Sequence, residues 1–143
     1  MDSSKIKLPV VSKGITLKEL PGELAVFFEI GNCTQRCPGC HSKHLWLTPE
    51  TEVKDLTSLK DMIKYARSQK RHGATAIVLM GGTTNNIKQH HLMLAVRLLS
   101  AVLPVGLYSG ATKDIETHKL LMNFTPLKWL KTGSYIEALG GLS

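Results

Sequence analysis

The stretch that decides the fold runs from Leu24 to Cys40 and reads LAVFFEIGNCTQRCPGC. Its first seven residues form an apolar run with a glycine turn on either side, and short apolar runs bounded by turn residues are typical of buried strands. Three cysteines, Cys33, Cys37 and Cys40, follow the run directly. We therefore expect a buried strand whose carboxyl end leads into a thiol-rich loop.

Three further apolar runs also end at a turn that contains glycine. They are Ala74 to Met80 before Gly81-Gly82, Val105 to Tyr108 before Ser109-Gly110, and Leu127 to Lys131 before Thr132-Gly133. A smaller strand is expected near the N-terminus, from Ile15 to Leu20.

Helical patterns separate these strands. The first places apolar residues at spacings of three and four, with basic residues on the other side of the helix. The apolar set is Leu56, Leu59, Ile63 and Ala66, and the basic set is Lys60, Lys64, Arg67 and Lys70. Ser58 followed by Asp61 resembles a capping box at its start. A second helix is expected from His91 to Leu103, with Leu94, Leu98 and Val102 as its inner face, and a third from Thr112 to Asn123.

Alternating strands and helices predict an α/β fold with a mainly parallel sheet, as one domain over residues 1–143. Four strands cannot close an eight-stranded barrel, so the expected architecture is a small incomplete (βα) barrel or an open sheet. Ligands bind at the carboxyl ends of parallel strands, and the cysteine loop and the glycine turns should share that edge. Tyr108 and Lys131 are weaker candidates there, since a half-buried strand tyrosine explains Tyr108 equally well and an ordinary charged strand end explains Lys131 better.

The composition predicts a soluble cytoplasmic protein with no membrane partner. The chain is 43% hydrophobic and 20% charged, and no apolar run approaches the roughly 20 residues that span a bilayer. Residues 1–13 do not resemble a signal peptide. The formal net charge is +7, with basic residues gathered at Lys64, Arg67, Lys70, Arg71 and His72. This cluster is a solvated helix face or a surface for an acidic protein; no nucleic-acid motif accompanies it.

The cysteines are spaced C-x3-C-x2-C, and they are the only three in the chain. An odd number of close neighbours does not suit a disulfide framework. Thiolates are soft ligands that suit iron–sulfur clusters and zinc. A Cys3His zinc site completed by His41 or His44 is one alternative. The other is a 4Fe–4S cluster with three cysteine ligands, whose fourth iron is free to bind a substrate.

The motif resembles that of radical S-adenosylmethionine enzymes. Within that superfamily, the chain is similar to the activating proteins of anaerobic ribonucleotide reductase, which are glycyl-radical enzyme activases. The resemblance rests on GNCTQRCPGCHSKHLW (31–46), VLMGG (78–82), VGLYSG (105–110) and LKTGSYIEALGGL (130–142). The superfamily usually has an acidic residue after the glycine pair, where this chain has Thr83.

The resemblance implies a site and a reaction. Cys33, Cys37 and Cys40 would ligate the cluster, and S-adenosylmethionine would contact Gly39, Cys40, His41 and the pair Gly81 and Gly82. The enzyme would cleave this cofactor reductively and generate a glycyl radical on the reductase. A low-potential donor such as flavodoxin or ferredoxin would supply the electron, and the basic face would dock it. The alternatives are a radical enzyme that acts on a small molecule and a non-enzymatic zinc-binding interaction module.

Overall fold

The computed structural model describes residues 5–18, 20, 22–30, 56–80, 89–109, 116–132 and 135–138. The strands are β1 (Lys7–Leu8), β2 (Val10–Thr16), β3 (Ala25–Ile30), β4 (Thr57–Ser58), β5 (Ala76–Met80), β6 (Val105–Ser109), β7 (Trp129–Thr132) and β8 (Tyr135–Ala138). The helices are α1 (Leu59–Arg71), α2 (Gln89–Ser100) and α3 (Glu116–Phe124).

Six of these strands form one sheet, in the order β2-β3-β5-β6-β7-β8. The four central strands β3, β5, β6 and β7 are parallel. At the two edges of the sheet, β2 pairs antiparallel with β3 and β8 pairs antiparallel with β7. The α/β class and the mainly parallel sheet are therefore confirmed. The four strands predicted from apolar runs are the four parallel ones.

The flanking strands differ from the sequence expectation. The N-terminal strand was expected from Ile15 to Leu20, but β2 ends at Thr16 because Thr16 pairs with Ala25 and the chain must turn there into β3. Leu17 is 72% exposed, whereas Leu20 is buried beyond the turn. Strand β8 was not predicted, because only pairing with β7 distinguishes its four residues from a loop.

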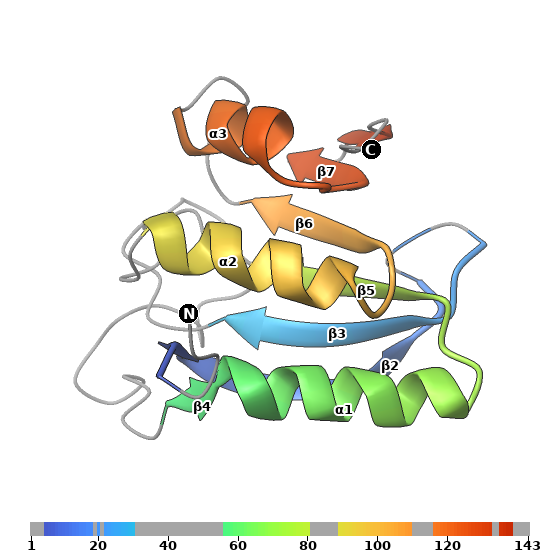
Figure 1. Ribbon diagram of the computed structural model, residues 1–143. Helices are drawn as coiled ribbons and strands as arrows, with labels where there is room; N and C mark the ends of the chain where they lie inside the picture. Colours follow the sequence, from blue (N-terminus) through green and yellow to red (C-terminus); the bar gives the residue numbers. More distant parts are fainter. Residues whose placement is uncertain are drawn as a thin grey trace.

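The three helices of the described residues pack on one face of the sheet, here called the helix face (Figure 1). Successive parallel strands that lie side by side with right-handed crossovers place every connecting helix on the same face. The main core lies between these layers. It joins alternate strand residues to the inner residues of the helices, among them Val26, Phe28, Ile77, Leu79, Leu107, Met62, Val96, Leu99 and Leu121.

The predicted inner faces of the helices are partly correct. In α1, Leu59 and Ala66 are buried and Lys60, Lys64, Arg67 and Lys70 are exposed, as expected. Leu56 is 47% exposed, because it precedes β4 and lies outside the helix. In α2, the fully buried residues are Leu92, Ala95, Val96 and Leu99, with Leu94 and Leu98 only partly buried. Because α2 has many apolar residues, its sequence alone does not select the stripe that faces the sheet.

The start of α1 is fixed by local and distant contacts. Ser58 is the N-cap, and its hydroxyl accepts a hydrogen bond from the Asp61 backbone N–H at 3.1 Å. This confirms the predicted Ser58–Asp61 cap, since it satisfies one of the amides that a helix start leaves unpaired. The backbone N–H of Leu59 donates to the carbonyl of Ile6 at 2.7 Å, and β4 pairs with β1.

None of the described helices is long and apolar enough to cross a membrane.

Candidate functional site

The carboxyl ends of the four parallel strands lie along one edge of the sheet, here called the carboxyl edge. The ends are Ile30 of β3, Met80 of β5, Ser109 of β6 and Thr132 of β7. The end of β3 at Ile30 therefore lies beside the end of β5 at Met80, since β3 and β5 are direct neighbours. The expected convergence of these strand ends is confirmed.

The predicted cofactor residues lie beyond these strand ends. Cys33, Cys37, Gly39, Cys40, His41, Gly81 and Gly82 lie outside the described residues, as does Thr83. The cluster and the S-adenosylmethionine contacts therefore stay predictions. Within the described ranges, no group of three or more His, Cys, Asp or Glu side chains could hold a metal ion.

In the sequence, the segment that carries the cysteines lies between β3 and β4, and both strands pair with the N-terminal stretch. Ile30 of β3 pairs with Val10 of β2, and Thr57 of β4 pairs with Leu8 of β1. Val10 and Leu8 belong to the same N-terminal stretch, because β1 and β2 are separated only by Pro9. This stretch therefore pairs both with the strand that precedes the cysteine segment in the sequence and with the strand that follows it.

The face of the sheet opposite the helices, here called the second face, has its own pattern. Its buried residues are Leu20, Ala25, Ala76 and Val78, with Phe27, Met80, Tyr108 and Trp129 packed against them and partly buried. The fully buried strand residues lie toward the amino ends of the strands. The partly buried ones include the last residues before the carboxyl edge. The second face thus becomes more accessible toward that edge.

Two glycines allow close packing at the amino-terminal part of the second face. A Cβ on Gly106 would lie 3.3 Å from Leu20 Cδ2 and 3.3 Å from Trp129 Cβ, so the absence of a side chain lets Leu20 lie against β6. A Cβ on Gly14 would lie 2.8 Å from Phe27 Cε2, so the Phe27 ring lies over the β2 backbone. Large side chains therefore fill this part of the face.

A row of side chains with polar ends crosses the second face next to the carboxyl edge. The strand register places Ser12 opposite Glu29, Glu29 opposite Met80, Met80 opposite Tyr108 and Tyr108 opposite Lys131. Side chains of cross-strand pairs lie on the same face of a sheet. We call Ser12, Glu29, Met80, Tyr108 and Lys131 the edge row, and all five are half-buried.

Both charged side chains of the edge row, Glu29 and Lys131, contact a neighbour within the row. The Ser12 hydroxyl donates to Glu29 Oε1 at 2.5 Å. Lys131 Nζ lies 4.2 Å from the centroid of the Tyr108 ring, within the range of a cation–π contact. The row therefore presents a carboxylate at one end and an ammonium group at the other, with a thioether and a phenol between them. Such a row suits a ligand that carries charges of both signs.

Sequence reasoning identified part of the edge row. Tyr108 and Lys131 were candidates for the carboxyl edge, and both lie on the second face beside it. Glu29 was missed, because it was counted as part of an apolar strand. Its position two residues after Phe27 could have indicated that Glu29 and Phe27 lie on the same face of the sheet, since alternate residues of a strand share a face. Only the structure identifies which of the two faces is free of the described helices.

No family model, curated protein or solved structure matches this chain.

Proposed function

We propose that this protein is a radical S-adenosylmethionine activase that generates a glycyl radical on anaerobic ribonucleotide reductase. The observation that carries the proposal is the parallel pairing of β3 with β5. This pairing sets the carboxyl ends of the two strands side by side, and these strands directly precede the cysteine segment and Gly81-Gly82 in the sequence. A cofactor bound by both segments requires this adjacency.

The donor set fits a cluster with one free iron. Cys33, Cys37 and Cys40 are the only cysteines of the chain, so three irons of a 4Fe–4S cluster would have protein ligands. Gly39, Cys40, His41, Gly81 and Gly82 would contact S-adenosylmethionine. When bound, the cluster and this cofactor would supply the one-electron chemistry, and the protein's own residues would not have to. The protein would position them and exclude water.

The arrangement of the sheet is compatible with an incomplete (βα) barrel. Parallel strands in sequential order with all helices on one face are the arrangement found in such barrels. In this proposal, the second face would be the inner surface, and the edge row would lie at its mouth. Glu29, Tyr108 and Lys131 would then be candidates to contact the bound cofactor.

The proposed partners are the reductase and an electron donor. A glycine in a loop of the reductase could approach the second face, because the described helices lie on the other side. A low-potential donor such as flavodoxin or ferredoxin would supply electrons. A cytoplasmic location belongs to the same proposal, since that compartment keeps thiols reduced.

Electron paramagnetic resonance of the anaerobically reconstituted, reduced protein tests this function. We expect a 4Fe–4S signal that changes when S-adenosylmethionine is added, and 5′-deoxyadenosine as a product. Replacement of any one cysteine, for example Cys37→Ala, should abolish both. Zinc without sulfide would instead establish a zinc module. Cofactor cleavage that transfers no radical to any reductase would point to a small-molecule radical enzyme.

A further inference from the structure

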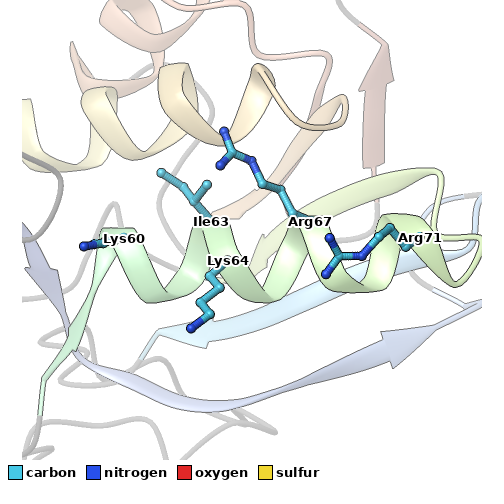
Figure 2. A pocket seen from close by; sticks show the side chains of 5 residues that line it. All are labelled: Lys60, Ile63, Lys64, Arg67 and Arg71. Atoms are coloured by element: carbon cyan, nitrogen blue, oxygen red, sulfur yellow. The ribbon is translucent and has the colours of Figure 1, made fainter.

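A basic groove runs along α1 on the outside of the molecule (Figure 2). It has a volume of about 600 Å³ and is lined by Lys60, Ile63, Lys64, Arg67 and Arg71. The four cationic residues lie at spacings of four, three and four, which places them within roughly 60° of arc on the helix. They span about 16 Å along its axis at 1.5 Å per residue. The four cationic residues are therefore attached along one side of the helix, here called the cationic stripe.

The charge of α1 is unbalanced. Its sequence, LKDMIKYARSQKR, contains five basic residues and one acidic residue, Asp61. All five basic residues are exposed. More than half of the net charge of +7 on the whole chain therefore comes from this one helix. Such a concentration raises the local electrostatic potential and attracts an acidic partner from a distance.

The groove also has an apolar element. Ile63 is partly buried and packs against the main core, so its position is fixed by the fold. In Figure 2, Ile63 and Arg67 extend on the side of α1 toward α2, while Lys64 points the other way. The aliphatic stems of lysine and arginine add apolar surface around Ile63. A matching ligand would combine carboxylates with one apolar side chain.

We propose that the basic groove docks an acidic helical segment of a partner protein. Three turns of helix match the length of the stripe, and carboxylates at spacings of three and four would meet the four cations. Arginine binds carboxylates with two parallel hydrogen bonds, which favours Arg67 and Arg71 as anchors. Nucleic acid is disfavoured, because single strands bind to grooves that offer aromatic rings for stacking, and none of the described residues that line this groove is aromatic.

This docking site is separate from the proposed active site. The groove lies on α1, on the helix face, whereas the edge row lies on the second face. A protein bound in the groove would leave the second face free for another molecule. The inference does not require a bound cluster, so it can fail or succeed independently of the proposed function.

A peptide-binding experiment tests the inference with the full chain. The probe is a fluorescein-labelled three-turn helical peptide with glutamates at spacings of three and four around one leucine, measured by fluorescence anisotropy at low salt. We expect binding that weakens about tenfold in Lys64→Glu/Arg67→Glu. The matched control Lys18→Glu/Lys119→Glu changes the net charge equally at exposed sites outside the groove. It should retain most of the binding.

Further probes distinguish an acidic helical segment from other possible ligands of the groove. A peptide with glutamine in place of glutamate should not bind, and a peptide with serine in place of leucine should bind several-fold more weakly. Equal losses in both double variants would overturn the inference, because attraction would then depend on net charge alone. Tighter binding of a single-stranded RNA oligomer in the same groove would also overturn it. Circular dichroism of each variant checks that α1 is intact.

Discussion

Gly14 is the residue on which the packing of Phe27 over β2 depends. A Cβ at this position would lie 2.8 Å from Phe27 Cε2, which is shorter than any normal contact. We predict that Gly14→Ala destabilises the protein by about 1 kcal/mol, because overpacking forces the ring to move. Urea denaturation of both proteins measures the difference.

The Phe27→Leu background provides the control for this prediction. Leucine lacks the ring atoms that the new methyl group would meet, so Gly14→Ala should be neutral or slightly stabilising there. An equal loss of stability in both backgrounds would show that the strain comes from the β2 backbone and not from the ring.

Lys131 is the cation of the edge row, and its ammonium group lies over the Tyr108 ring. Under the proposed function, Lys131→Met keeps the aliphatic stem but removes the attraction for a cofactor that carries a carboxylate. We predict that the apparent affinity for S-adenosylmethionine falls about fivefold, or ~1 kcal/mol, while the fold is retained. The rate of 5′-deoxyadenosine formation against cofactor concentration measures this effect.

Lys128 offers a matched control for Lys131. It is an exposed lysine three residues earlier, before the start of β7, and its ammonium group lies 6.0 Å from the Trp129 ring centroid. Lys128→Met should leave the cofactor affinity unchanged. If both variants lose affinity equally, Lys131 acts only through the overall charge.

At the scale of elements, Arg97 joins two helices. From α2, its Nε–H and Nη2–H groups donate to the carbonyl of Phe124, the last residue of α3, at 3.0 and 2.6 Å. This carbonyl is one of those that a helix end leaves without an intrahelical partner. A forked, charge-assisted contact of this kind stabilises the end of α3.

We predict that Arg97→Lys lowers the melting temperature by roughly 3 °C, which corresponds to about 1 kcal/mol for a chain of this size. Lysine keeps the charge but cannot donate through a rigid fork. Arg71→Lys, at the exposed end of α1, should change the melting temperature little. Differential scanning calorimetry on matched preparations distinguishes the two, and equal shifts would contradict the role assigned to Arg97.

At the scale of the whole molecule, the basic groove and the edge row lie on opposite faces of the sheet, so the two proposed partners would not compete for one surface. If the acidic protein in the basic groove is the electron donor, Lys64→Glu/Arg67→Glu should slow cluster reduction by reduced flavodoxin about tenfold. Reduction by dithionite, a small molecule that needs no docking, should be unchanged. Raising the salt concentration should slow the flavodoxin reaction of the unmodified protein, because screening shortens the reach of the charges.

The rates of cluster reduction by flavodoxin and by dithionite distinguish damage to the cluster site from docking of the donor elsewhere. Slow reduction by both reagents would mean that the substitutions damage the cluster site, and equal rates with flavodoxin would mean that the donor docks elsewhere. The absence of any reducible cluster would contradict the proposed function but leave the peptide-binding inference untouched.

The sequence by itself determined the four parallel strands, most of the three helices, the cap at Ser58 and the cysteine motif. Local signals suffice for these features: short apolar runs that end at glycine, three- and four-residue periodicity, and ligand spacing. The cationic stripe was visible for the same reason, since helix geometry alone places Lys60, Lys64 and Arg67 on one side.

Only the tertiary structure decided the antiparallel flanks β2 and β8, the buried stripe of α2 and the composition of the edge row. Each depends on hydrogen bonds or packing between segments far apart in the chain. Glu29, Tyr108 and Lys131 come from three different strands, and only the register between those strands places them in one row. A one-residue shift in register would move a side chain to the other face, so pairing carries this information and local sequence does not.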